Sequence, residues 1–572
     1  MAPKRTFYIG LNMAGAISAG AYTAGVIDFL IDALDTWYAA RQEQHKLYGE
    51  DYAKWTIPAH DVKIVVMSGA SAGGMTSAIA ASALQRTFHP VRDAAHPPAD
   101  NLLYKGWVQS IDIQPLLGSA DLADPNAPVV SILDSSIIDK IAADCLHGGT
   151  DLPAAREYVL DGLKLILTLT NLRGVPYTIE KNNGAANQES VANYYADMQQ
   201  FEVFRGTPRP ESTLSVPLSA SSPANWSYLQ EAAKATGAFP LMLAPRHLKR
   251  GAAEYNARTF NVAKADPAVV NGACACSEDT PQRPHWDLRD GDSFETFNVD
   301  GGVTNNSPFD CAHRALVSFD NANAPQGHAP RDAKNADRAV ITIAPFPVDD
   351  AFDPQYKPDT DLLKIGAKLF DVAVAQSRFQ GENIHLAQQD DVFSRFAIAP
   401  IAGKNEAKAL ACGTLNAFGG FLSQAFRAHD YQLGRRNCQQ FLRAYFVLPP
   451  DNPVMASALP PAGPQRDALL RNFPAQLPDG SPALPLIPLL GPLTQEIRVD
   501  PVQMRPPEVE RLLPMVSARI KLVVTRMIEQ RHIGWLPKEA FDVAWLLMHG
   551  QIQERLRTHI LDSLAKDGFL RE

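Results

Sequence analysis

The sequence predicts an α/β protein, and two observations near its start support that fold class. Apolar runs rich in β-branched residues occur at 6–11 and 61–67, and such runs are typical of buried strands. Each run is followed by a segment whose apolar side chains recur at helical spacing, at 21–34 and 74–84. The order strand, helix, strand, helix implies a mostly parallel central sheet covered by helices.

Further segments extend this prediction to about residue 350. Strands are expected at 163–169 and 338–343, and a helix at 227–236 that ends before Gly237. Residues 85–160 have Pro-rich and Asp-rich patches and poor periodicity, so we expect loops and short helices there, as a lid or an insertion over the sheet. Together these segments predict one domain over residues 1–350.

The texture of the sequence changes beyond residue 350, where a mainly helical C-terminal extension is expected over 351–572. Residues 449–507 hold many prolines and predict a long irregular connector. The periodicity predicts helices at 362–376, 421–445 (broken at Gly434), 507–530 and 538–564.

Composition excludes some functions. The chain has 572 residues and a formal net charge of -9, which argues against a nucleic-acid partner. Six cysteines in so long a chain predict no disulfide framework and favour a reducing, cytoplasmic location. Cys274 and Cys276 form a C-x-C pair, but no second Cys or His cluster completes a zinc site, so no metal or cofactor is expected.

The N-terminus superficially resembles a secretory signal, because Lys4 and Arg5 precede an apolar stretch over 7–26. Asn12, Ser18 and several glycines interrupt that stretch, and the same residues form the first predicted strand and helix. No uninterrupted apolar run approaches the roughly 18 residues that span a bilayer. We therefore expect no cleaved signal and no integral membrane segment.

The segment Gly69-Ala70-Ser71-Ala72-Gly73 has the Gly-x-Ser-x-Gly form of a nucleophile elbow. This form places a serine on a sharp strand-to-helix turn with its hydroxyl exposed. A predicted strand precedes the motif and an alanine-rich helix follows it, which is the context that the motif requires. The other interpretation is a tight turn in which the serine only caps the helix.

Asp300-Gly301-Gly302 follows another apolar run and places a carboxylate in a glycine-flanked turn that can approach a second loop closely. A serine nucleophile needs a base, so Asp300 is the candidate base for Ser71. A Ser-Asp-His triad that uses His313 is the alternative. His313 lies in a segment with helical spacing, where a structural histidine is the more common role, so the sequence favours a dyad.

With these motifs the sequence resembles the patatin-like phospholipases, which are serine acyl hydrolases with a Ser-Asp dyad. The resemblance covers roughly residues 6–347. It rests on Gly15-Ala16-Ile17-Ser18-Ala19-Gly20, the segment 69–74, Ala235-Thr236-Gly237-Ala238-Phe239-Pro240, and the segment 300–308 with its Asp-Gly-Gly-x-x-Asn-Asn-x-Pro pattern.

The resemblance implies a three-layer α/β/α core in which Ser71 is the nucleophile and Asp300 its base, and it implies hydrolysis of acyl esters in lipids, phospholipids first. Backbone amides of Gly15, Ala16 and Ile17 would form the oxyanion hole. It makes a lipid the expected partner and leaves the oligomeric state and any activator open.

The small-residue loop departs from the family pattern. Family members often carry Gly-Gly-Gly-x-Arg/Lys-Gly, whereas Ala16, Ile17 and Ala19 replace two glycines and the basic residue here. Two alternatives therefore stay open. One is a catalytically weak lipid-binding or scaffold protein, and the other is an acyltransferase or thioesterase that uses the same dyad.

Two basic stretches lie outside the resemblance. Gly434-Arg435-Arg436-Asn437 could bind a lipid phosphate, but a surface ion-pair cluster or a helix break is the favoured interpretation. The segment with Arg519, Lys521, Arg526 and Arg531 has a basic amphipathic pattern that suits a peripheral contact with an anionic membrane. A helix that packs on the core with a solvated face is favoured there.

Overall fold

The computed structural model describes residues 5–148, 156–180, 189–209, 214–258, 260–265, 276–319, 330–346, 391–401, 410–530 and 538–571, together with 372, 377 and 389. The helix expected at 362–376 lies outside the described residues except for residue 372, and so does Cys274.

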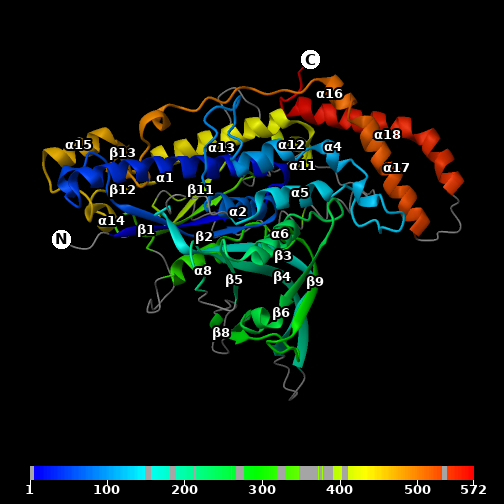
Figure 1. Ribbon diagram of the computed structural model, residues 1–572, viewed down its shortest axis with the longest axis horizontal. Helices are drawn as coiled ribbons and strands as arrows, with labels where there is room; N and C mark the ends of the chain where they lie inside the picture. Colours follow the sequence, from blue (N-terminus) through cyan, green and yellow to red (C-terminus); the bar gives the residue numbers. More distant parts are fainter. Residues whose placement is uncertain are drawn as a thin grey trace, which may run out of the picture.

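A nine-stranded sheet forms the centre of the molecule (Figure 1). Its main path runs β11-β10-β1-β2-β3-β4-β5, and the pairs from β11 to β3 are parallel. β4 and β9 pair antiparallel with β3, and β6 pairs antiparallel with β9. The predicted α/β class with a mostly parallel sheet is therefore confirmed. The bounds are β1 Thr6–Met13, β2 Asp61–Gly69, β3 Val159–Glu180, β4 Glu189–Val203, β5 Ser215–Leu218, β6 Arg246–Gly251, β9 Ser293–Asp300, β10 Arg338–Ile343 and β11 Arg395–Ile398.

The central strands are apolar because both of their faces are covered by helices. On one side α2 (Ser71–Ala83) packs on β1, β2 and β3, and on the other α8 (Phe309–Ser318) packs on β1, β2 and β10. Two separate apolar clusters result, one that contains Phe7 and Ile64 and one that contains Val65, Leu316 and Val340. The carboxyl ends of β1 and β2 thus form a rigid edge on which loops can be positioned.

Two long helices, α1 (Gly20–Tyr48) and α13 (Gln424–Ala444), run side by side although they are far apart in the sequence (Figure 1). The two helices approach closely because a glycine of each helix packs against the backbone of the other. A β carbon on Gly25 would overlap the Tyr431 carbonyl, and one on Gly434 would overlap the Tyr22 carbonyl. The predicted break at Gly434 is therefore wrong: α13 is continuous there, and the glycine serves helix packing.

Arg435, on the same helix, corrects a second expectation. Its side chain is not at the surface but 2% exposed, and it forms ion pairs with Asp28 and Asp32 of α1. Asp32 also pairs with Arg92. A buried arginine between two carboxylates links the helices and is not presented to a lipid phosphate. α1 is long and apolar enough to cross a membrane, but 94% of its most apolar window is buried inside the protein, as in a core helix.

The region 85–160 contains short helical pieces that sit over α2 and α6 (Pro223–Thr236). They are α3 Leu102–Tyr104, a π-helical turn at Lys105–Ser110, α4 Ile113–Leu116 and α5 Ser136–Cys145. The connector 449–507 is less irregular than predicted and contains α14 Pro453–Ala456, α15 Pro464–Asn472, β13 Ala475–Gln476 and β14 Pro482–Pro485, with β12 Val447–Leu448 just before it. A second hairpin pairs β7 (Phe260–Ala265) with β8 (Cys276–Gln282), and α7 spans Ala252–Asn256.

The chain closes with α16 (Pro506–Glu510), α17 (Leu513–Gln530) and α18 (Lys538–Lys566). Arg519 of α17 is 2% exposed and makes a two-bond ion pair with Asp121 of the 85–160 region. Its guanidinium also donates to the carbonyl of Ile132 at 2.7 Å. Part of the basic face of α17 therefore makes contacts inside the protein. This agrees with the favoured interpretation, in which the helix packs on the core.

Candidate active site

Ser71 lies at a strained turn between β2 and α2. Its φ is 53°, a conformation that non-glycine residues adopt rarely and that is typical of a nucleophile elbow. The flanking glycines make the turn possible: a β carbon on Gly73 would overlap the Met13 carbonyl, and one on Gly69 would lie 2.6 Å from the Gly73 backbone. Ser71 is 6% exposed. The fold therefore forces the serine into a fixed position at the edge of the sheet.

Asp300 ends β9, and pairing of β9 with β3 sets it opposite Leu169, next to the elbow. The Ser71 hydroxyl donates to Asp300 Oδ2 at 2.6 Å, and the Gly302 amide donates to Oδ1 at 2.7 Å. A β carbon on Gly301 would overlap the Thr168 carbonyl, so the turn fits only without a side chain there. Two motifs 229 residues apart thus meet in a direct hydrogen bond.

His313 lies in α8, as its helical spacing predicts, and its ring stacks on Phe309 with centroids 5.7 Å apart. Among the described residues that line the cavities beside Ser71, there is no histidine. The geometry brings the predicted serine and carboxylate together and does not bring His313 to them.

The loop after β1 closes the other side of Ser71. The Gly15 amide donates to the Asn306 carbonyl at 2.9 Å, so this N–H is already used within the protein. The amides of Ala16 and Ile17 have no acceptor among the described residues. Ile17 has a φ of 48°, and both residues line a small cavity with Ser71 and Asp300.

The outer side of this loop is held by the C-terminal part of the chain. The Ser18 hydroxyl donates to the Ala417 carbonyl at 2.5 Å and accepts from the Gly420 amide at 3.0 Å. These partners lie in α11 (Thr414–Ala417) and α12 (Gly419–Leu422). Ala19 is fully buried here, so the basic residue common in the resembled family would have no access to water at this position.

The segment 235–240 positions the dyad, a role that the sequence motif did not reveal. The Ser71 amide donates to Thr236 Oγ1 at 3.0 Å, and the Asp300 amide donates to the Ala238 carbonyl at 2.9 Å. One short segment therefore holds the backbone of both residues. In the sequence this segment is visible as a block of small residues followed by Phe239-Pro240. The spacing of these residues alone does not show which backbone atoms the segment binds.

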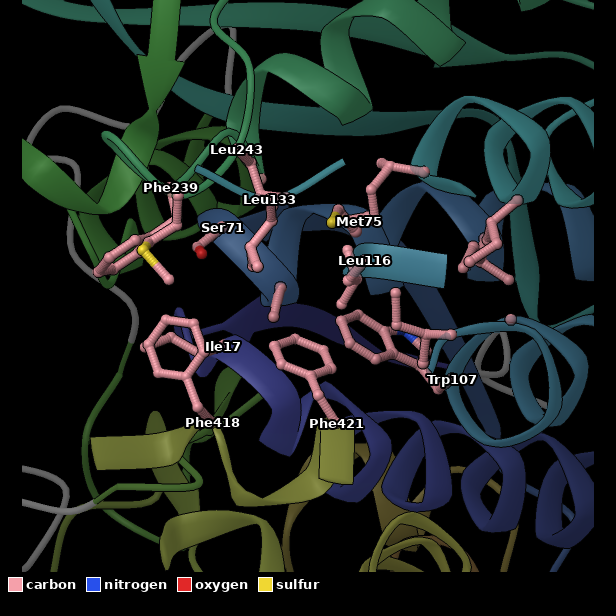
Figure 2. Close-up of a pocket in the computed structure, with 18 residues that line it drawn as sticks. Ile17, Ser71, Met75, Trp107, Leu116, Leu133, Phe239, Leu243, Phe418 and Phe421 are labelled. Carbon is pink, nitrogen blue, oxygen red and sulfur yellow. The ribbon is translucent and has the colours of Figure 1, made fainter. Parts of the chain in front are cut away.

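Ser71 also opens onto a larger, apolar cavity with about 680 Å³ of empty space, its open mouth included. Figure 2 shows Ser71 and Phe239 toward one end and Trp107 at the other, with Phe418 and Phe421 facing in from the opposite wall. Phe418 and Phe421 come from beyond residue 410 and were not predicted as site residues. The remaining lining is also hydrophobic: Met75, Ile79, Ile111, Leu116, Leu133, Ile138, Ile141, Met242 and Leu243.

Cys145 lies next to Gly106, a residue that lines this cavity. Burial raises the pKa of its thiol to about 12, so it is not a thiolate at neutral pH. Among the described residues, no group of three or more His, Cys, Asp or Glu side chains is placed to hold a metal ion. Ser71 is therefore the nucleophile candidate that the geometry supports.

Fold and site together define an α/β protein with a serine on a nucleophile elbow, hydrogen-bonded to a carboxylate beside an apolar cavity. No family model matches the chain. The uncharacterized protein y4iI of Sinorhizobium fredii is 32% identical over 605 aligned residues, which cover 98% of this chain and 82% of that protein. The chain belongs to the same family as y4iI.

Among solved structures, VipD from Legionella pneumophila aligns over 98% of this chain and 90% of its own, with 11% identity and a TM-score of 0.22. A similarity this small supports no inference about fold or function. What the site does must follow from its own geometry.

Proposed function

We propose that the protein is a serine acyl hydrolase that cleaves carboxylic esters of lipids through Ser71 and Asp300. The observation that supports this most directly is the 2.6 Å hydrogen bond from the Ser71 hydroxyl to Asp300 Oδ2, made at a nucleophile elbow. The proposal includes a patatin-like three-layer core, on the strength of the motifs at 15–20, 69–74, 235–240 and 300–308.

The proposed reaction uses Asp300 as base and then as acid. Asp300 accepts the Ser71 proton as Oγ attacks the ester carbonyl carbon, and the carbonyl oxygen becomes an oxyanion. When this intermediate collapses, the ester C–O bond breaks and Asp300 returns the proton to the leaving alcohol. Water then attacks the acyl-enzyme, Asp300 takes its proton, and collapse releases the acid as the proton returns to Ser71 Oγ.

Backbone amides near Ser71 would stabilise the oxyanion. The amides of Ala16 and Ile17 line the small cavity, and Ala72 follows the nucleophile at the start of α2, where the helix N-terminus favours negative charge. In this proposal Gly15 supplies close approach and not a hydrogen bond, since its amide is bonded to Asn306.

The apolar cavity indicates the substrate class. Ser71 is one of its lining residues, so an ester carbonyl at Ser71 can place its acyl chain among Met75, Leu116 and Trp107. Burial of each CH₂ group contributes about 0.8 kcal/mol, and a polar acyl group would gain nothing there. A long-chain ester, such as a phospholipid or neutral lipid, fits this lining best.

We further propose that the protein meets its substrate at a lipid surface, from the cytoplasm. One wall of the cavity is formed by two facing loops, in which the Ile132 amide donates to the Leu241 carbonyl at 2.8 Å. Leu133, Met242 and Leu243 line the cavity, whereas their neighbours Ile132 and Leu241 are 40% and 78% exposed. An outward apolar wall over an acyl cavity suits contact with lipid.

A fluorophosphonate probe tests the proposal. Purified protein should be labelled at Ser71 and should release fatty acid from phospholipid or triacylglycerol, and Ser71→Ala should do neither while it keeps the wild-type unfolding temperature. Absence of labelling in the folded wild-type protein would contradict an enzymatic role and favour lipid binding alone. Labelling with ester products that form only when an alcohol acceptor is supplied would favour an acyltransferase.

A further inference from the structure

Asn306 places an amide side chain against both members of the dyad. A β carbon on Gly15 would overlap Asn306 Oδ1 and lie 3.0 Å from Ser71 Cβ. A β carbon on Gly302 would likewise overlap Asn306 Oδ1 and lie 3.0 Å from Asp300 Oδ1. The oxygen of this amide therefore occupies the space that the two glycines leave open beside the dyad.

The amide nitrogen of Asn306 is a buried donor. The residue is 2% exposed and lines the small cavity with Ser71 and Asp300. Its Nδ2 has no hydrogen-bond partner among the described residues. A buried donor without an acceptor costs about 1–3 kcal/mol, so its presence calls for a partner that arrives with a ligand.

The structural task of Asn306 is done by its backbone and not by this nitrogen. The Asn306 carbonyl accepts the Gly15 amide at 2.9 Å and so anchors the loop that carries Ala16 and Ile17. A variant that loses only the side chain keeps this anchor. The two roles of Asn306, support of the loop and donation from Nδ2, are therefore separable by mutation.

We infer that Asn306 Nδ2 donates a hydrogen bond to the substrate's carbonyl oxygen as it becomes the oxyanion, which makes Asn306 a catalytic residue beside Ser71 and Asp300. This inference rests on the proposed function. A neutral amide suits the position, because a lysine or arginine this close to Asp300 would form an ion pair and weaken the carboxylate as a base. Asn306 Nδ2 would act together with the backbone amides of Ala16 and Ile17, which lie in a loop where two glycines of the family pattern are replaced.

The test compares Asn306→Ala and Asn306→Asp with the wild-type protein on a soluble short-chain ester. Loss of one oxyanion donor lowers kcat by about 10²- to 10³-fold. We expect that fall for both variants, with KM within about threefold, because the contact strengthens only in the transition state. Asn306→Asp keeps the size of the side chain but has no N–H donor at neutral pH.

A second readout excludes a merely structural effect. A trifluoromethyl ketone captures Ser71 as an oxyanion adduct, so its affinity should fall by the same factor as kcat. The matched control is Asn305→Ala, since Asn305 is not among the described residues that line the two cavities. It should keep activity within about threefold, and far-UV circular dichroism should show that all variants are folded at the assay temperature.

Activity of Asn306→Ala within threefold of wild type would overturn the inference, as would a loss confined to KM or a loss shared equally by Asn305→Ala. These results leave the proposed function intact. If wild-type protein neither hydrolyses esters nor reacts with the fluorophosphonate, the proposed function fails, and the role of Asn306 fails with it.

Discussion

The two cavities that meet at Ser71 differ in the polar groups that line them. The small one is lined by Asp300, Asn306 and the loop after β1, together with Phe239 and Val303, whereas the large one is lined mainly by aliphatic and aromatic side chains. The polar groups lie where the proposed reaction would break the ester bond, and most of the remaining lining is apolar. Under the proposed function, the reaction and the selection of substrate take place on opposite sides of Ser71, so substitutions should impair them separately.

The largest effect is expected on the polar side. Asp300→Asn removes the base, and we expect kcat to fall by about 10³- to 10⁴-fold for esters of every chain length. Steady-state kinetics on a series of 4-nitrophenyl esters measure this. The same change at exposed Asp310 should have no effect, and a loss restricted to long chains would contradict the division of roles.

A matched pair of glycine substitutions sharpens the comparison. A β carbon on Gly15 would overlap Asn306 Oδ1 and crowd Ser71, so Gly15→Ala should displace the loop and lower kcat by about 10²-fold on all esters. Gly106 lines the apolar side, and its β carbon would meet the end of the Ile79 side chain at 3.2 Å and Cys145 Sγ at an ordinary 3.5 Å. Gly106→Ala should therefore keep activity on short esters within about threefold. Equal losses of activity in both variants would contradict the division of roles between the two cavities.

Filling the apolar side should change selectivity and not chemistry. Leu116 is buried and projects into the cavity in Figure 2. Leu116→Trp should lower kcat/KM for long-chain esters by about 10- to 100-fold and leave short-chain esters nearly unchanged, because a steric change of a few carbons is worth about 1–3 kcal/mol. Leu122→Trp, at a buried position outside the described lining, is the control for packing strain.

The smallest effect concerns the outward face of the wall. Leu241→Asp should weaken binding to phosphatidylcholine vesicles by about tenfold, since about 1.4 kcal/mol of apolar contact is lost. Sedimentation with vesicles measures this, and hydrolysis of a soluble ester should not change. Leu47→Asp, at a residue 68% exposed near the far end of α1, should bind like wild type. Equal binding by Leu241→Asp would place the lipid contact elsewhere.

The sequence predicted the elements that position the dyad because their signals are local. The strands at 6–11 and 61–67 agree with β1 and β2 to within a few residues, and the elbow lies between β2 and α2 as its motif requires. The proximity of Ser71 and Asp300 was also predicted, because each chemical group requires the other. The direct hydrogen bond between Ser71 and Asp300 favours the dyad over a triad with His313. The dyad is a hypothesis that activity measurements test.

Other features could not be predicted because they depend on partners distant in sequence. Gly434 looks like a helix break until its contact with the Tyr22 carbonyl is known, and Arg435 looks exposed until it is paired with Asp28. Phe418 and Phe421 line the apolar cavity from a region that resembles no catalytic motif. The domain boundary near residue 350 stays a prediction, although α1 and α13 pack directly together.

The hydrogen bonds from Ser18 to the segment 417–420 have a consequence for biosynthesis. The loop beside Ser71 is braced by residues made long after both Ser71 and Asp300 have left the ribosome. A nascent chain that ends at residue 350 holds the nucleophile and base but lacks the brace and the Phe418 wall. Under the proposed function, ester cleavage should therefore begin only after the segment 410–421 has left the ribosome and folded against the loop.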